Sequence, residues 1–109
     1  MKHSQGYSSE LPPTRFNMAR YCLDMAAQTT PDKVALIVVS DAQAPVRTAE
    51  QWSYARLNEA VRRVAAGLRQ LGLDPRARIM IRMGNTSDYA LLFFGAVAAG
   101  YVPLPSSAQ

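Results

Sequence analysis

The sequence contains very little cysteine and histidine, and each shortage excludes a class of site. Cys22 is the single cysteine in 109 residues, so no internal disulfide can stabilise the fold, and we expect a cytoplasmic protein in a reducing compartment. His3 is the single histidine and lies in a polar leader, away from partners for a nucleophilic triad. These two residues cannot form a metal site, because metal sites need clustered ligands at fixed spacing.

Lysine is also scarce, since Lys2 and Lys33 are the only two among twelve basic side chains. The arginines are spread along the chain and no basic run alternates with aromatic residues, so the net charge of +4 does not predict a nucleic-acid partner. The six glycines are dispersed as well, and no lysine follows a glycine-rich loop of the kind that holds phosphate. We therefore expect no catalytic, cofactor-binding or metal-binding residue in this chain.

The sequence has no hydrophobic run typical of a membrane span. Residues 89–104 carry no charge, but about sixteen residues fall short of the roughly twenty that a spanning helix needs, and Pro103 and Pro105 interrupt the segment. The first fourteen residues are polar and do not resemble a signal peptide. We expect a flexible leader over residues 1–14, a single domain over residues 15–109 and no membrane span.

The first half of the domain carries a helix pattern and then a hairpin pattern. Residues 16–28 predict a helix that Asn17 caps and Phe16 staples, and its wide apolar face predicts contact with more than one neighbour. Residues 34–39, VALIVV, form a continuous apolar run typical of a strand covered on both faces. Residues 47–52 are expected to pair back with this strand as a hairpin.

The clearest helix pattern lies in the middle of the chain. Ser53 is expected to cap a helix over residues 54–71, which a left-handed Gly72 ends. One side is rich in arginine, which is consistent with a phosphate or nucleic-acid surface or with a solvated amphipathic face, and we favour the solvated face. The other side repeats apolar residues at spacings of three and four: Leu57, Val61, Val64, Ala65, Leu68 and Leu71.

A strand, a helix and a second strand follow. Residues 78–83, RIMIRM, predict a strand, and Asn85 is expected to cap a helix over residues 86–99, with Asp88 near its positive end. Residues 101–104 are expected to form the next strand. Because the loops between these elements are short, they predict a βαβ unit with parallel strands.

The helix over residues 86–99 has no polar face, so it predicts a layered α/β fold that covers it from several sides. Within it, Gly95 marks a close approach of another element, and Gly100 is expected to end the helix. The whole pattern predicts a βαβ unit, a mixed sheet that includes a hairpin, and packing helices. Because 109 residues can hardly cover so apolar a helix, we expect an incomplete domain and self-association of the isolated chain.

Two segments, QWSYARLNEAVRRVAAGLRQLGL and RIMIRMGNTSDYALLFFGAVAAGYVPLPSS, resemble the N-terminal region of the adenylate-forming, AMP-binding enzymes. The resemblance rests on the ordered motifs WSYARL at residues 52–57, Gly95-Ala96 followed by Gly100, and VPLP at residues 102–105. The opening FNMARYCLDMAAQTTPDKVALIVV is similar to the start of the acid–CoA ligase branch. One turn departs from the family, which usually has Gly-Asp-Arg where this chain has Arg76-Ala77-Arg78.

The resemblance implies a longer parent enzyme, an AMP-forming acyl-CoA synthetase. Such an enzyme converts a carboxylate and ATP to an acyl-adenylate and pyrophosphate, with Mg²⁺ on the phosphates, and CoA then displaces AMP. The family's phosphate loop, adenine motif, ribose-binding aspartate, hinge and catalytic lysine match no residue here. We therefore expect an inactive N-terminal structural segment whose partner is the remainder of the synthetase.

Two alternatives stay open for the function of the chain. The parent could be an adenylation domain that loads a carrier protein instead of CoA, or the chain could be a stand-alone protein-interaction module that uses its exposed apolar surface. If the parent is an acyl-CoA synthetase or an adenylation domain, six residues of this chain are expected to have structural and not catalytic roles: Trp52, Tyr54, Leu57, Phe93, Phe94 and Gly95.

Overall fold

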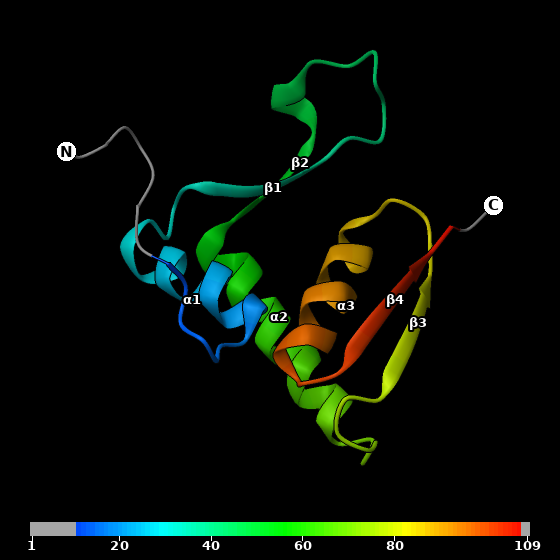
Figure 1. Ribbon diagram of the computed structural model, residues 1–109. Helices are drawn as coiled ribbons and strands as arrows, with labels where there is room; N and C mark the ends of the chain where they lie inside the picture. Colours follow the sequence, from blue (N-terminus) through cyan, green and yellow to red (C-terminus); the bar gives the residue numbers. More distant parts are fainter. Residues whose placement is uncertain (1–10, 108–109) are drawn as a thin grey trace.

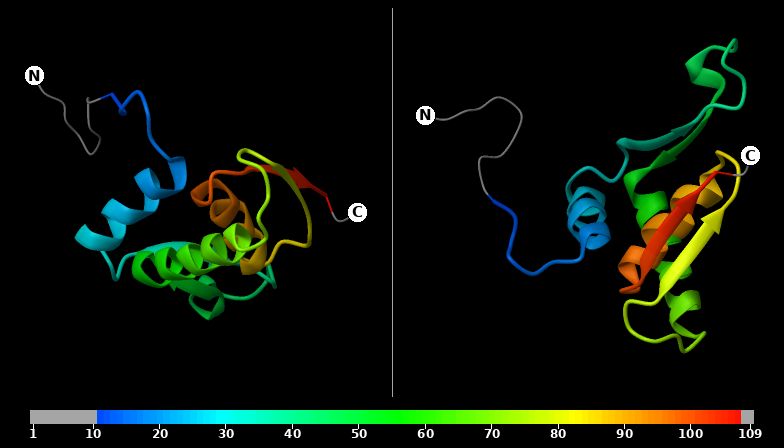
Figure 2. Two further views of the ribbon diagram at one scale, coloured as in Figure 1. Left: turned by 90° about the horizontal axis from the view of Figure 1, so that it is seen from below. Right: turned by 45° about the vertical axis from the view of Figure 1, so that its right-hand side comes forward.

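Within residues 11–107, which the computed structural model describes, three α-helices and four β-strands alternate along the chain (Figure 1). The first ten residues of the expected leader lie outside the described residues. Helix α3 lies between α2 and one pair of strands, and a hairpin packs against α2 (Figures 1 and 2). The elements are α1 (Met18–Thr29), β1 (Val34–Val38), the 3₁₀ turn η1 (Val46–Thr48), β2 (Glu50–Ser53), α2 (Tyr54–Arg69), β3 (Arg78–Arg82), α3 (Ser87–Ala98) and β4 (Val102–Ser106).

Helix α1 begins as the sequence predicts. The Asn17 side chain accepts hydrogen bonds from the backbone N–H groups of Ala19 and Arg20, at 3.0 and 3.3 Å. The Phe16 and Tyr21 rings lie 4.9 Å apart between centroids, which confirms the hydrophobic staple. The predicted contact with more than one neighbour is also confirmed, because α1 packs against both α2 and α3 and buries Ala19 and Leu23.

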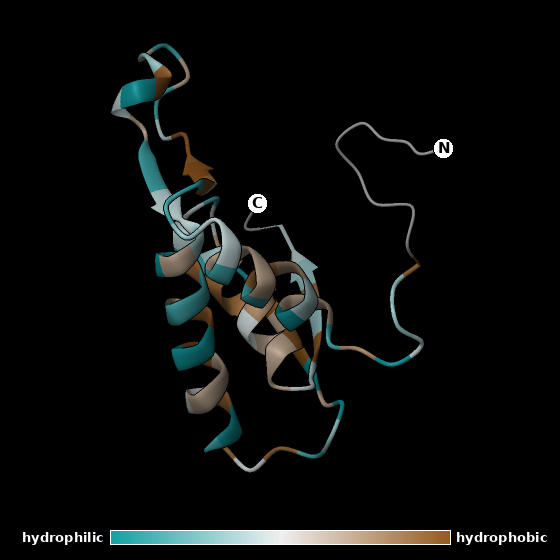
Figure 3. Cartoon of the chain, turned by 90° about the vertical axis from the view of Figure 1, so that its left-hand side faces the viewer, coloured by the Kyte–Doolittle hydropathy of each residue, from teal (hydrophilic) through white to brown (hydrophobic). Residues whose placement is uncertain are grey.

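The hairpin is confirmed, but the predicted cover on both faces of its first strand is wrong. β1 pairs antiparallel with β2, and Leu36 lies opposite Trp52. Val34 and Ile37 remain 42% and 44% exposed, because within the described residues β1 has one partner strand and packs mainly on α2. Figure 3 shows the brown, apolar ribbon of this strand beside the helices. β2 also begins three residues later than expected, since residues 46–48 form the turn η1 instead of extended chain.

Helix α2 places one apolar face in the core of the described chain. Its cap is confirmed, because the Ser53 hydroxyl oxygen accepts a hydrogen bond from the backbone N–H of Arg56 at 3.2 Å. Leu57 and Val61 are 4% and 1% exposed and pack with residues of α1, β2 and α3. The helix ends at Arg69, not at Leu71, which is 64% exposed, and Gly72 takes the predicted left-handed conformation with φ +68°.

The βαβ unit is confirmed, since β3 and β4 pair in parallel and α3 packs against both strands. The predicted cap is wrong: Thr86, not Asn85, precedes the helix, and its side chain makes no capping hydrogen bond. A backbone hydrogen bond from Thr86 N–H to Gly84 O closes a tight turn there, so the helix begins only at residue 87. Asp88 lies in the first turn and Gly100 follows the helix with φ +91°, both as expected. The α/β architecture is as predicted, but the hairpin does not join the parallel strands in one mixed sheet: within residues 11–107 the two pairs form separate sheets, and α2 and α3 pack between them.

Helices α2 and α3 cross at Gly95, which confirms the predicted close approach. A Cβ atom added to Gly95 would lie 2.9 Å from Cβ of Val64 on α2, closer than real Cβ contacts allow. Small residues let the two backbones come together here, and Ala96 is fully buried. The large side chains of α3 are only partly buried in the described chain, so the apolar helix does lack complete cover: Leu91, Leu92, Phe93, Phe94 and Val97.

The turn that departs from the family pattern has an unusual backbone. Arg76 has φ +62°, the left-handed region that glycine adopts without cost and that other residues rarely enter. The turn is held by hydrogen bonds from Arg76 N–H to Gly100 O at 3.2 Å and from Ala77 N–H to Asp74 O at 3.0 Å. The loss of glycine at this position therefore adds local strain just before β3.

Candidate functional site

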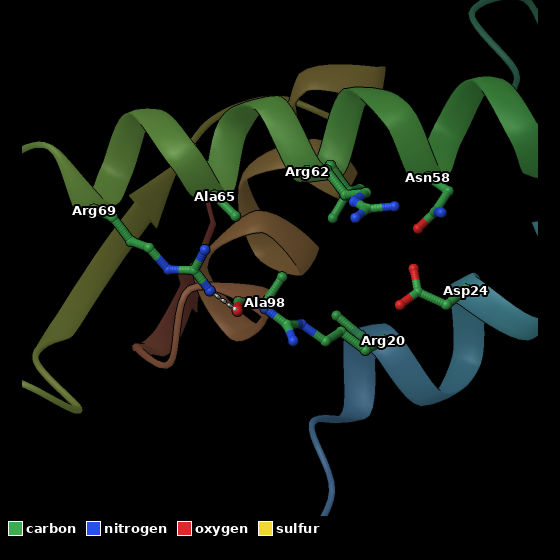
Figure 4. Close-up of a pocket in the computed structure, with 9 residues that line it drawn as sticks. Arg20, Asp24, Asn58, Arg62, Ala65, Arg69 and Ala98 are labelled. Atoms are coloured by element: carbon green, nitrogen blue, oxygen red, sulfur yellow. Dashed lines mark hydrogen bonds between the residues drawn. The ribbon is translucent and has the colours of Figure 1, made fainter.

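A polar cavity lies between α1 and α2, at the end of α3 (Figure 4). It has a volume of about 170 Å³, and its rim is formed mainly by charged side chains. Figure 4 shows Arg20 and Asp24 projecting from α1, and Asn58, Arg62 and Arg69 projecting from α2 toward the space between the helices. The lining is completed by small and apolar residues: Ala19, Val61, Ala65 and Ala98.

The helical spacing of these residues explains why they meet. Arg20 and Asp24 are four residues apart on α1, and Arg62 and Arg69 are seven apart on α2, so each pair lies on one helix face. The favoured interpretation of the arginine-rich side of α2 as a solvated face is confirmed, because Arg62, Arg63 and Arg69 are all exposed. That interpretation does not identify the cavity, because a spacing of seven residues on one helix does not reveal which helix lies opposite.

One of the three guanidinium groups has a partner in the protein. Arg69 donates a hydrogen bond from Nη2 to the backbone oxygen of Ala98, at 2.9 Å, near the negative end of α3. The guanidinium groups of Arg20 and Arg62 have no hydrogen-bond or ion-pair partner among residues 11–107. Because arginine stays protonated, the guanidinium groups can bind an anion but supply no acid–base chemistry themselves.

A second depression lies at the carboxyl ends of the parallel strands, which is where open α/β sheets bind ligands. Its side chains are neutral, so they could orient a ligand by hydrogen bonds but cannot transfer protons readily at neutral pH. The depression lies next to the start of α3, and its lining comes from both strand ends and the turn between β3 and α3: Met83, Gly84, Asn85, Tyr89, Pro105, Ser106 and Ser107.

The residues expected to be structural do take part in packing. Trp52 is 9% exposed, and its indole N–H donates to Glu50 Oε2 at 2.5 Å while the Arg56 guanidinium lies 3.8 Å from the ring centroid. Leu57 belongs to the core, and Tyr54 and Phe94 pack against it. Phe93 lies edge-on to Phe94 with ring centroids 5.4 Å apart, and Gly95 is the helix crossing described above.

The described residues offer no cluster of metal ligands for Mg²⁺, and the arginine cavity is too small for ATP or CoA. Among residues 11–107, no three acidic, cysteine or histidine side chains gather as metal ligands would. The arginine cavity, at about 170 Å³, is smaller than the roughly 300–1,000 Å³ typical of cofactor sites. We therefore derive no reaction step through these groups, and the absence of site residues from the whole chain stays a prediction. Within the described range, no helix is both long and apolar enough to span a bilayer.

Comparisons with known proteins place these observations in a family. The chain is 32% identical over 82 residues to the vibriobactin-specific 2,3-dihydroxybenzoate-AMP ligase of Vibrio cholerae, covering 75% of this chain and 13% of that protein. It is 42% identical over 52 residues to 4-hydroxybenzoate–CoA/benzoate–CoA ligase of Rhodopseudomonas palustris, covering 48% of this chain and 10% of that protein. The chain thus spans only a small part of the length of these curated relatives.

A solved structure supports the same relationship. The fold matches acetoacetyl-CoA synthetase from Streptomyces lividans with a TM-score of 0.74 and 28% identity, covering 84% of this chain and 14% of that one. The family model described as AMP-binding enzyme matches residues 23–109, from the middle of α1 onward. This chain therefore belongs to the AMP-binding family of adenylate-forming enzymes.

Proposed function

We propose that this chain is the N-terminal structural segment of an AMP-forming acyl-CoA synthetase. The family match over residues 23–109 carries the proposal, and the similarity to a benzoate–CoA ligase and to acetoacetyl-CoA synthetase supports the CoA-dependent branch. The complete enzyme would convert a carboxylate, ATP and CoA to acyl-CoA, AMP and pyrophosphate, in cytoplasmic fatty acid metabolism. ATP, Mg²⁺ and CoA would be held by residues outside this segment.

The segment's contribution is to hold a βαβ unit against two helices. Helix α3 is fixed by its crossing with α2 at Gly95, and its last carbonyl groups accept hydrogen bonds from Asn17 and Arg69. The partly covered side chains of α3, together with exposed Val34 and Ile37 on β1, support the remainder of the synthetase as the partner. A scaffold of this kind needs no catalytic side chain.

The test uses the product of the complete reading frame, purified and supplied with a panel of carboxylates. Carboxylate-dependent exchange between ATP and pyrophosphate reports adenylate formation, and thioester formation with CoA reports the second step. We expect both activities. Exchange without CoA thioester would contradict the assignment to the acyl-CoA synthetases, and the absence of exchange with every carboxylate would count against an adenylate-forming parent.

A carrier-protein substrate is the second candidate for the complete enzyme. It is favoured by the 30% identity over 82 residues to a salicyl-AMP ligase/salicyl-S-ArCP synthetase of Mycobacterium tuberculosis, which covers 75% of this chain. Offering CoA and a phosphopantetheinylated carrier protein to the same enzyme separates the two candidates. Transfer to the carrier alone would select the second.

A stand-alone interaction module is the remaining alternative, and the 109-residue chain itself tests it. A module that evolved to act alone should be monomeric, fold cooperatively and keep its size on dilution. Light scattering over a dilution series distinguishes this behaviour from the concentration-dependent association that we propose for a segment with incompletely covered apolar faces.

A further inference from the structure

We propose that the cavity between α1 and α2 is a binding site for a single phosphate group. The site is separate from the chemistry of the proposed synthetase, and it depends on none of the groups expected to hold ATP or CoA. Its ligand class is a compact tetrahedral oxyanion, either free phosphate or the phosphate of a small ester.

Three guanidinium groups border one small space. Arg62 and Arg69 lie two turns apart on α2, and Arg20 comes from the facing helix α1 (Figure 4). Guanidinium groups bind phosphate well because their planar forks donate paired hydrogen bonds to its oxygens. Donors from two helices can contact different oxygens of one tetrahedral group.

These donors are available to a ligand. Arg20 and Arg62 have no guanidinium partner within residues 11–107, and Arg69 uses one of its five N–H donors on Ala98. The three arginine side chains are exposed, and the floor between them is apolar, with Ala19 and Val61 each 1% exposed. An anion bound there would therefore be held by the guanidinium groups and not by the floor.

The charge and the size of the cavity select phosphate. Three arginines and Asp24 give the lining a net charge of 3 − 1 = +2. A phosphate monoester carries about −1.5 to −2 at neutral pH and balances this charge, whereas a single carboxylate leaves about half of it. The volume of about 170 Å³ leaves room for one phosphate group between the helices.

Calorimetric titration of the 109-residue chain with inorganic phosphate, at constant ionic strength, measures the binding directly. We expect saturable binding that Arg62→Gln and Arg20→Gln each weaken at least about tenfold, because each removes a charge-assisted fork. Asp24→Asn should tighten binding, since it removes the one negative charge from the lining. This increase in phosphate affinity could not result from a general loss of structure, so it indicates a specific site.

Arg63→Gln is the matched control, because it makes the same charge change one position away, on a side chain that is 78% exposed and outside the cavity. We expect less than a twofold effect. Equal weakening by Arg63→Gln and Arg62→Gln would overturn the proposal in favour of diffuse attraction to a basic chain, and so would the absence of saturable binding at millimolar phosphate. Arg62→Lys, which keeps the charge and loses the fork, should give an intermediate affinity and guards against misfolding of the Gln variant.

AMP serves as the second ligand and identifies the source of the phosphate group. Binding of AMP with the same dependence on Arg20 and Arg62 assigns the site to phosphate esters. Binding of inorganic phosphate alone assigns it to free phosphate, because the site then rejects the nucleoside. Either result supports the site. An unmodified chain that binds neither inorganic phosphate nor AMP contradicts it.

Discussion

Asn17 joins the beginning of α1 to the end of α3 through a single side chain. Its amide oxygen accepts from the backbone N–H groups of Ala19 and Arg20, while its Nδ2 donates to the backbone oxygen of Val97 at 2.7 Å. Helix ends leave backbone groups without partners, and here one residue satisfies groups at two ends that lie 80 residues apart in the sequence. Asn17 is therefore both a local cap and a long-range tie.

Replacing Asn17 by alanine should lower the free energy of unfolding by about 1.5–3 kcal/mol, the sum of a lost cap and a lost hydrogen bond to a carbonyl group. Asn17→Asp is the informative control. It keeps the cap at α1 but removes the donor and places a negative charge beside the negative end of α3. Urea denaturation should rank the proteins as wild type, then Asn17→Asp, then Asn17→Ala. Equal stability of wild type and Asn17→Asp would show that the bond to Val97 contributes nothing.

Gly95→Ala should be strongly destabilising, because the new Cβ would lie 2.9 Å from Val64 Cβ and the two helices would have to separate. We expect a loss of about 1–3 kcal/mol. Gly67→Ala is the control and should have the opposite effect, because nothing lies within 4 Å of the new Cβ and alanine favours a helix more than glycine does. We expect it to raise the free energy of unfolding by about 0.5–1 kcal/mol. Thermal denaturation of both variants tests the pair. The nearest atom to the new Cβ is Cγ1 of Val64, which Val64→Ala removes while keeping Cβ. A partial recovery of stability in Gly95→Ala combined with Val64→Ala would therefore locate the clash.

Arg76→Gly should stabilise the protein although it removes a side chain. The φ of +62° costs a non-glycine residue about 1–2 kcal/mol, and the greater flexibility of glycine in the unfolded chain offsets about half of the gain. The expected net increase is about 0.5–1 kcal/mol in the free energy of unfolding. Gly72→Ala, at φ +68°, should change stability in the opposite direction. Destabilisation by Arg76→Gly would mean that the arginine side chain contributes more than its backbone strain costs.

The outer face of β3 and β4 should drive self-association of the 109-residue chain. Met80 and Leu104 lie side by side in the parallel register and are 70% and 39% exposed, on the face opposite to buried Ile81. Met80→Lys is expected to lower the apparent mass in light scattering at concentrations where wild type is associated. Val46→Lys, a similar change at a 62% exposed position on η1, should leave the mass unchanged. A wild-type chain that is monomeric at every concentration would contradict this prediction.

The sequence predicts most elements correctly where the signal is local. Asn17, Ser53 and Gly72 act within a few residues of their own positions, so their roles follow from residue type and spacing. The start of α3 was misplaced because Asn85 and Thr86 are both acceptable caps, and the backbone turn at Gly84 decides between them.

Long-range contacts account for the rest of what the sequence left open. The bond from Asn17 to Val97 and the meeting of Arg20 with Arg62 depend on how three helices pack, and no spacing within one helix encodes that arrangement. The predicted burial of both faces of β1 is wrong for the same reason. An apolar run indicates that a strand is suited to burial, but it does not show whether other elements of the chain pack on both of its faces.

The two-stranded sheets have a consequence for assembly. Every strand within residues 11–107 has a neighbour on one side only, so each sheet presents two rows of outward backbone amide and carbonyl groups. A strand from elsewhere can lengthen either sheet without displacing anything already there. Helix α3 already packs against β3 and β4 and keeps several large side chains only partly buried, so strands added at either edge of this sheet would extend a surface that the helix supports.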